Sequence, residues 1–181
     1  MTVTPKGAAR RQALLDAVVR VLERGGPSAV THRAVAAEAG VPLAAATYYF
    51  SSLDDMFVSA LRDATDKQLS ALVPLASASV TEVAHELVDF TTRDRGAAIA
   101  QYELLFLAMR RDALKADAER WYGALESALA VRMPGDDAGT TARRHRAAWA
   151  IDGLILQMLW RGIPATVAET VDVLAGILDA P

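Results

Sequence analysis

Apolar residues recur at intervals of three and four along almost the whole of this 181-residue chain, which is the spacing of one face of an α-helix. No stretch shows the alternating pattern of a half-buried strand, and no internal repeat is found. Glycine and proline interrupt the helical pattern at Gly25-Gly26-Pro27, Pro74, Pro134-Gly135 and Gly162-Ile163-Pro164. The sequence therefore predicts an all-α protein of about nine helices.

The four amino-terminal helices have recognisable ends. We expect them over about residues 8–24, 31–39, from 41 onward, and 52–73. A loose basic arm at residues 1–7 precedes the first helix, and Pro74 ends the fourth. Thr31 is a typical N-cap, and Gly40 supplies the left-handed residue that ends the second helix. Pro42 is expected in the first turn of the third helix, where its missing N–H does no harm. Ser52 and Asp55 resemble a capping box.

Five further helices are expected in the rest of the chain. The first of them begins near Thr81, and the next three cover about residues 95–110, 112–132 and 141–161. The capping box of Thr166 and Glu169 starts the last helix, which ends near Leu178. The acidic stretch 134–139 is expected to be a loop. We place the domain boundary at the start of the fourth helix, with one domain at residues 1–52 and the other at residues 53–181.

Charge is distributed unevenly along the chain. The first fifty residues carry six basic and three acidic side chains, a net charge of +3, whereas the remainder carries 13 basic and 19 acidic ones, a net charge of −6. A basic amino-terminal part suits contact with phosphates. There is no cysteine, which excludes disulfides and thiolate chemistry, and no apolar run long enough for a membrane span. We expect a soluble cytoplasmic protein without signal peptide, metal or cofactor.

The segment Thr31–Phe50, THRAVAAEAGVPLAAATYYF, has the pattern of a helix-turn-helix. Two short helices that cross steeply need a small contact residue and a tight turn, which Ala36 and Gly40 supply. The expected shared core of the motif consists of Val35, Ala39, Val41 and Tyr49. In such a unit the second helix enters the major groove of DNA while the first crosses the backbone.

The same segment resembles the tetracycline-repressor (TetR) family of bacterial regulators. The resemblance covers about residues 10–60 and rests on Thr31-His32-Arg33, on the Ala36/Glu38/Gly40 pattern, on Val41, and on Tyr48-Tyr49-Phe50 followed by Ser52-Leu53-Asp54-Asp55. It implies a homodimeric DNA-binding regulator, most simply a repressor, that leaves a palindromic operator when a small apolar or amphipathic effector binds. It leaves open whether the protein represses or activates.

Carried over to this sequence, the resemblance implies eight DNA-contacting residues. Thr31 and Arg33 would hold phosphates, Pro42, Leu43, Ala44 and Ala45 would lie nearest the bases, and Thr47 and Tyr48 would contact the backbone or base edges. The family commonly has Tyr where Thr47 stands and Lys where Leu53 stands, which removes or shortens two phosphate contacts. A recognition helix this apolar predicts specificity through thymine methyl groups, Tyr48 and DNA shape. The alternative is that Leu43–Ala46 are core residues of a small bundle.

Aromatic residues and a few polar ones in the carboxy-terminal part are candidates for an effector cavity. The candidates are Tyr102, Glu103, Phe106, Met109, Trp121, Tyr122, Trp149 and Gln157, with His85 as a further polar candidate. A cavity of this kind needs a few convergent polar groups among apolar ones. For any single residue the alternative is ordinary core packing, since aromatic residues mostly fill cores.

The last two helices are apolar on more than one side, which predicts a dimer interface. The residues expected there are Ala148, Ile151, Asp152, Ile155 and Leu159 on the first of them, and Val167, Val171, Leu174, Ile177 and Leu178 on the last. Gly153 and Gly162 could allow close helix approach, or could only mark local packing. The basic run Arg143–Arg146 is expected to be a solvated helix face.

Two other classes of protein compete with the regulator. An enzyme is disfavoured because the three histidines are scattered, the single Glu82-x-x-His85 lacks the second pair of a di-metal bundle, and no phosphate-binding loop or nucleophile triad is present. A helical interaction protein whose amino-terminal part no longer binds DNA is the second alternative. Binding to its own upstream DNA at several salt concentrations separates this from the regulator.

Overall fold

The computed structural model describes residues 5–161 and 166–179. Within these ranges the chain forms nine α-helices, two short 3-10 turns and no strand, so the predicted all-α class is confirmed. In order they are α1 (Pro5–Gly25), η1 (Pro27–Ala29), α2 (His32–Glu38), α3 (Leu43–Tyr49), α4 (Leu53–Leu75), α5 (Val80–Thr92), α6 (Arg95–Ala108), η2 (Asp112–Leu114), α7 (Lys115–Arg132), α8 (Ala138–Arg161) and α9 (Val167–Asp179). None of the helices described is both long and apolar enough to cross a bilayer.

Most of the predicted helix ends agree with the structure, and capping residues are found at them. The Thr31 hydroxyl oxygen accepts the Ala34 N–H at 3.0 Å, and Gly40 has φ +65°, as predicted. The Thr166–Glu169 capping box is formed in full. The helix that was expected near Thr81 is capped instead by Ser79, which forms a full capping box with Glu82.

Several predicted boundaries are wrong by a few residues. The basic arm was expected to reach Gly7, but α1 already begins at Pro5. Pro42 precedes α3 as its N-cap rather than lying in its first turn. Pro74 lies inside the last turn of α4, which ends at Leu75. α8 begins at Ala138, within the predicted loop, because the Asp137 carboxylate accepts the Thr140 N–H and hydroxyl and so caps it. Gly162–Pro164 lie outside the described residues.

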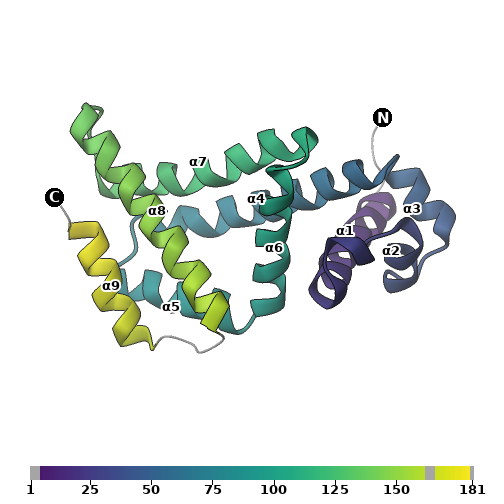
Figure 1. The fold of residues 1–181 in the computed structure, drawn as a ribbon, viewed down its shortest axis with the longest axis horizontal. Coiled ribbons are helices and arrows are strands. Elements are labelled where there is room, and N and C mark those ends of the chain that lie inside the picture. The colour runs from purple at the N-terminus through teal and green to yellow at the C-terminus, as the bar shows by residue number, and fades with distance from the viewer. Residues whose placement is uncertain (1–4, 162–165, 180–181) are drawn as a thin grey trace. The chain divides into compact units, whose positions relative to one another are not determined.

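The described helices divide into two compact units. One contains the chain through Asp66 together with Ile99–Glu119, and the other contains Lys67–Ala98 together with the chain from Arg120 onward. In the first unit α1, α2 and α3 pack on one another, as Figure 1 shows. In the second, α5, α8 and α9 pack together (Figure 1). The predicted domain boundary after residue 52 stays a prediction.

Burial explains the packing of the first three helices. One face of α1 is buried and consists of Leu14, Leu15, Ala17, Val18, Val21 and Leu22. Of the predicted motif core, Val35 is fully buried, whereas Ala39, Val41 and Tyr49 are half-buried. Ala36, Ala46 and Phe50 supply the remaining buried contacts. The three-helix core is therefore built on α1, and α3 contributes a single alanine to it from within the helix.

Candidate functional site

The outer face of α3 is exposed to solvent. Leu43 is 50 % exposed and Tyr48 is 77 % exposed, and Pro42, Ala44 and Thr47 are exposed as well. Ala45 is half-buried and Ala46 is fully buried. The alternative that Leu43–Ala46 are all core residues is therefore wrong, and holds only for Ala46.

The turn before α3 fixes how that helix projects. The Val41 N–H donates to the Ala36 carbonyl at 3.0 Å, and Gly40 adopts a left-handed conformation that residues with a Cβ disfavour. At the other end of α3, the Nε2 atom of His32 lies 2.9 Å from the Phe50 carbonyl oxygen. These contacts hold α3 at both of its ends while leaving its outer face open.

Two arginines of α1 hold the end of α2. Glu38 accepts hydrogen bonds from Arg24 and from Arg20, the latter at 2.6 Å. The hydrogen bonds from Arg24 and Arg20 hold the pKa of Glu38 below its usual value. These two arginines of the basic amino-terminal part therefore already have an acidic partner within the chain. Sequence analysis did not predict this pairing, although it included Glu38 in the motif. Arg33, by contrast, is exposed to solvent.

The polar side chains of the motif that are predicted to contact DNA differ in whether their hydroxyl proton is still available for a hydrogen bond. Thr31 accepts the capping N–H, so its own O–H remains able to donate. The Thr47 hydroxyl donates to the carbonyls of Leu43 and Ala44 at 3.3 and 3.2 Å, so its proton is already used within the helix. The Tyr48 ring stands edge-on to Tyr49, and its side chain is largely exposed. Tyr48 is therefore the better placed of the two donors on α3.

Two ion pairs connect the Ile99–Glu119 segment to α4 within the first unit. Arg62 donates from Nε and Nη2 to the two oxygens of Asp117, each at 3.0 Å, and the Asp117 side chain is only 4 % exposed. Arg111 pairs with Asp54, and its guanidinium lies over the Phe57 ring at 5.1 Å from the centroid. Two residues that follow α6 therefore form ion pairs with the first ten residues of α4. Sequence reasoning missed both pairs because their partners are more than fifty residues apart.

The eight predicted effector-contacting residues divide between the two units. Tyr102, Glu103, Phe106 and Met109 belong to the first, and Trp121, Tyr122, Trp149 and Gln157 to the second. Tyr102 and Trp121 are buried, Glu103 is half-buried, and the other five are exposed. The rings of Tyr102 and Phe106 are neighbours, with centroids 6.2 Å apart. Whether these residues line one cavity stays a prediction.

Glu103 stands out among the polar candidates. Its Oε2 atom is buried and has no hydrogen-bond partner, a condition that it shares, among the described side chains, only with Nε of Arg143. Burial raises the pKa of the Glu103 carboxyl above its usual value. Its Oε1 atom lies 3.6 Å from the position that a Cβ on Gly26 would occupy. The carboxylate therefore reaches the turn that follows α1.

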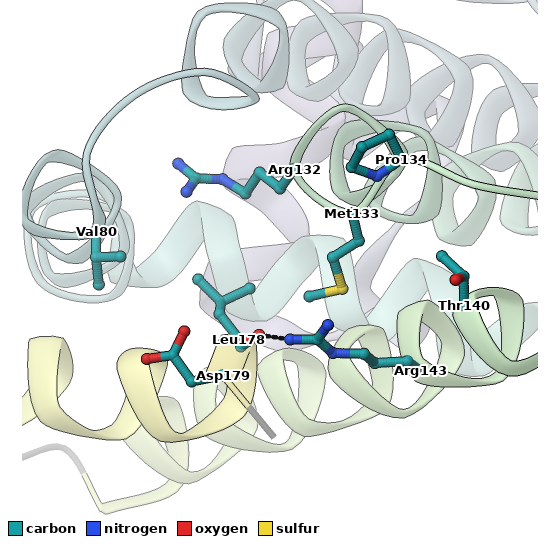
Figure 2. A pocket seen from close by; sticks show the side chains of 8 residues that line it. All are labelled: Val80, Arg132, Met133, Pro134, Thr140, Arg143, Leu178 and Asp179. Carbon is teal, nitrogen blue, oxygen red and sulfur yellow. Dashed lines mark hydrogen bonds between the residues drawn. The ribbon is translucent and has the colours of Figure 1, made fainter. Parts of the chain in front are cut away.

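A separate cavity of about 380 Å³ lies within the second unit (Figure 2). Its lining consists of Val80, Arg132, Met133, Pro134, Thr140, Arg143, Leu178 and Asp179, none of which was predicted to bind an effector. Arg143 donates to the Leu178 carbonyl, and Arg132 donates to the carbonyls of Leu75 and Ala78. Both guanidiniums thus satisfy carbonyls at or just beyond helix ends. The expectation that Arg143 lies on a solvated face is wrong, and Arg144 likewise bonds the carbonyls of Met133 and Gly135.

The expected interface residues of α8 and α9 pack largely within their own chain. Ala148, Ile151 and Leu174 belong to a buried cluster with Leu87 and Leu129, and Leu159 is buried too, so their placement at a dimer interface is wrong. Partly buried residues pack around this cluster, among them Ile155, Val167, Val171, Ile177 and Leu178. The large apolar side chains exposed on α8 are those of Trp149, Leu156 and Trp160, with exposed Gly153 between them. Their helical spacing places these four residues on one face.

These features define a class of protein. A three-helix unit with a glycine turn and an open second motif helix is a helix-turn-helix DNA-binding module. Comparison with known families identifies the chain more closely: residues 14–60 match the model for bacterial regulatory proteins of the tetR family, and residues 76–180 match the tetracyclin repressor-like carboxy-terminal domain. The chain belongs to the TetR family of DNA-binding transcriptional regulators, as the resemblance predicted.

Individual relatives agree with this assignment over most of the chain. The HTH-type transcriptional regulator BetI of Agrobacterium fabrum (strain C58) is 31% identical over 170 residues, which cover 88% of this chain and 82% of BetI. The nicotine-responsive transcriptional repressor HdnoR of Paenarthrobacter nicotinovorans is 29% identical over 107 residues, 56% of this chain and 55% of HdnoR. The multidrug binding protein EbrR, solved with imidazole, is 34% identical with a TM-score of 0.75 and covers 95% of this chain and 96% of EbrR. Further EbrR structures contain ethidium, proflavin or malachite green.

Proposed function

We propose that this regulator is a repressor that binds a pseudo-palindromic operator as a homodimer and leaves it when a small apolar or amphipathic effector binds. The observation that supports DNA recognition most directly is the open outer face of α3, held at both ends by Gly40 and by the His32–Phe50 contact. Leu43 and Ala44 offer methyl groups for thymine, and Tyr48 offers a hydroxyl for the backbone. Thr31 and Arg33 bind phosphates at the start of α2.

Arg33 gives a prediction about salt dependence. Each phosphate contact that a protein makes releases counterions and adds about one unit to the slope of log affinity against log salt concentration. We expect Arg33→Ala to weaken binding to every DNA sequence alike and to reduce that slope by about one unit. Fluorescence anisotropy at four or more salt concentrations measures it. Arg161→Ala is the matched control, since Arg161 is an exposed arginine of α8, and it should leave the slope unchanged.

A second protein copy would cover the aromatic face of α8. Trp160 is 86 % exposed and Trp149 70 % exposed, which is unusual for residues of this size on a monomer. A dimer that binds a pseudo-palindrome needs its two recognition helices about 34–36 Å apart, one turn of DNA. The exposed Gly153 lies between the two tryptophans in the helix and permits close approach of a partner helix.

Effector binding needs a physical connection to α4 if it is to change DNA affinity. The Arg62–Asp117 and Arg111–Asp54 pairs supply one, because they tie α4 to the Ile99–Glu119 segment that also holds Tyr102, Phe106 and Met109. An effector that prefers one position of this segment therefore shifts α4 and the helix-turn-helix that precedes it. The bound dyes of EbrR and the nicotine response of HdnoR support a small effector of this kind.

The experiment that tests the proposal measures binding to the DNA upstream of the protein's own coding sequence. We expect a dimer to bind that duplex about a thousand-fold more tightly than a scrambled duplex of equal length and composition. Anisotropy titrations at fixed salt give both affinities, and sedimentation gives the stoichiometry. Equal affinity for the two duplexes would contradict an operator in that region, and reporter expression that falls when the protein is deleted would contradict repression.

A further inference from the structure

The cavity of the second compact unit lies at the ends of four helices. α5 begins at it, α7 and α9 end at it, and the first two turns of α8 contribute to its lining (Figure 2). Its volume is about 380 Å³, and pockets for small molecules in proteins start at about 300 Å³, so it has room for a small ligand. The lining that the structure describes includes none of the eight predicted effector-contacting residues. The cavity is therefore a separate candidate binding site.

Both arginines of this lining retain N–H groups that no described residue accepts. Arg143 donates from Nη2 to the Leu178 carbonyl. Arg132 donates from Nη2 to the carbonyls of Leu75 and Ala78. A guanidinium carries five N–H groups, so these bonds use the smaller part of each. The Nη1 atoms of both side chains have no hydrogen bond among the described residues and are not among the buried atoms that lack one, so both are accessible to a ligand.

The positive charge of these two side chains is not balanced nearby. None of the ion pairs found among the described residues includes Arg132 or Arg143. The Nε atom of Arg143 is also buried without an acceptor, a condition that few polar groups of native proteins show. In the described lining the one carboxylate is that of Asp179, which is exposed to water. Two positive charges against one exposed negative charge attract an anion to the cavity.

The remaining side chains of the lining are mainly apolar. They are those of Val80, Met133, Pro134 and Leu178, together with Thr140. In the view of Figure 2, Met133 and Leu178 lie between the two arginine side chains. The Thr140 hydroxyl already donates to Asp137 at 2.6 Å, so the guanidiniums are the donors that remain for an anion. A planar carboxylate matches the donor geometry of a guanidinium, and the apolar side chains suit a compact apolar group attached to it.

We infer that this cavity binds a small carboxylate that carries a compact apolar group. The carboxylate accepts a hydrogen bond from Nη1 of Arg143, and the apolar group packs against Met133 and Leu178. Because Arg143 also holds the Leu178 carbonyl near the end of α9, an anion that offsets its charge stabilises the contact between α8 and α9. The inference goes beyond the proposed function, since it adds a ligand site that depends neither on the effector nor on DNA.

The test uses three molecules of one shape that differ in charge. At neutral pH benzoate is an anion, benzamide is uncharged and benzamidine is a cation. Isothermal titration calorimetry with the full-length protein should give benzoate an affinity at least about tenfold higher than that of benzamide. Benzamidine should not displace benzoate. Inorganic phosphate, which has charge but no apolar group, should bind at least about tenfold more weakly than benzoate at the same ionic strength.

Three variants assign the binding to this cavity. Arg143→Met removes the charge and the donors, and should weaken benzoate binding at least about tenfold. Arg161→Met, at an exposed arginine of the same helix, is the matched control and should leave the benzoate affinity unchanged. Val80→Phe narrows the cavity but keeps both arginines, so it should also weaken benzoate binding. A benzoate concentration about ten times its dissociation constant should raise the melting temperature of the wild type by about 3–6 °C and leave that of Arg143→Met unchanged.

Several results would overturn the inference. They are an absence of benzoate binding, equal affinity for benzoate and benzamide or phosphate, displacement of benzoate by benzamidine, and an unchanged benzoate affinity in Arg143→Met. If Arg143→Met loses helix content because the Leu178 carbonyl loses its donor, Val80→Phe decides, and full benzoate affinity in that variant overturns the inference. Operator affinity measured without benzoate tests the proposed function separately, since its loss would contradict DNA recognition and leave the benzoate result standing.

Discussion

Ala44→Glu should reduce operator affinity by about a hundredfold or more while leaving the fold intact. Ala44 is exposed in the first turn of α3, on the face with Leu43 and Tyr48. A carboxylate there meets the phosphates and base acceptors of the groove, and like charges juxtaposed across an interface cost several kcal/mol. The helix itself tolerates the change, because alanine and glutamate differ little in helix propensity.

The control for this prediction is Ala142→Glu. Ala142 is an exposed alanine of α8, so the same change adds the same charge and volume at a surface far along the chain from the motif. Anisotropy titrations of both variants against the operator duplex, with circular dichroism to confirm helix content, make the comparison. If Ala44→Glu retained operator affinity within threefold, α3 would not be the helix that reads DNA.

Phe57→Ala should cost about 3–5 kcal/mol of the free energy of unfolding, as large aromatic truncations in cores do. Phe57 is 1 % exposed on α4, seven residues after buried Phe50, and carries the Arg111 guanidinium over its ring. Truncation removes the buried ring and also takes away the surface on which Arg111 rests. Because Arg111 pairs with Asp54, the α4 contact with the Ile99–Glu119 segment weakens at the same time.

Urea denaturation followed by circular dichroism measures this loss. Leu53→Ala is the matched control on the same helix, since Leu53 is 37 % exposed and its truncation should cost about 1 kcal/mol or less. A loss below about 1 kcal/mol for Phe57→Ala would mean that the core between α4 and its neighbours collapses around the missing ring. Such a small loss would also show that Arg111 does not depend on the Phe57 ring for its position.

The local structure of the motif could be predicted because it depends on local interactions. Thr31 caps α2, Gly40 takes the left-handed turn, and the Thr166–Glu169 box starts α9, each through contacts within four residues. Where predictions of helix ends were wrong, another local group was stronger. The side chain of Asp137 starts α8 before the expected residue, and Ser79 does so for α5.

Contacts between distant segments could not be predicted from the spacing of residues. Nothing in the sequence indicates that Asp117 is the buried partner of Arg62, or that Arg143 is used by the Leu178 carbonyl. The apolar faces of α8 were recognised, but a periodic pattern does not tell which face packs inside the chain. Ile151 lies on the inward face of α8 and Trp149 on the outward one.

The composition of the first compact unit limits how the two matched regions can be exchanged between relatives. Family models match residues 14–60 and 76–180 as separate pieces, yet Asp117 and Arg111, which hold α4, come from the second piece. A chimera cut once between the two matched pieces, after α4, would combine an α4 from one parent with ion-pair partners from the other. A transplanted piece that includes α4 should therefore be transferred together with its own Ile99–Glu119 segment, so that both partners of each ion pair come from one parent.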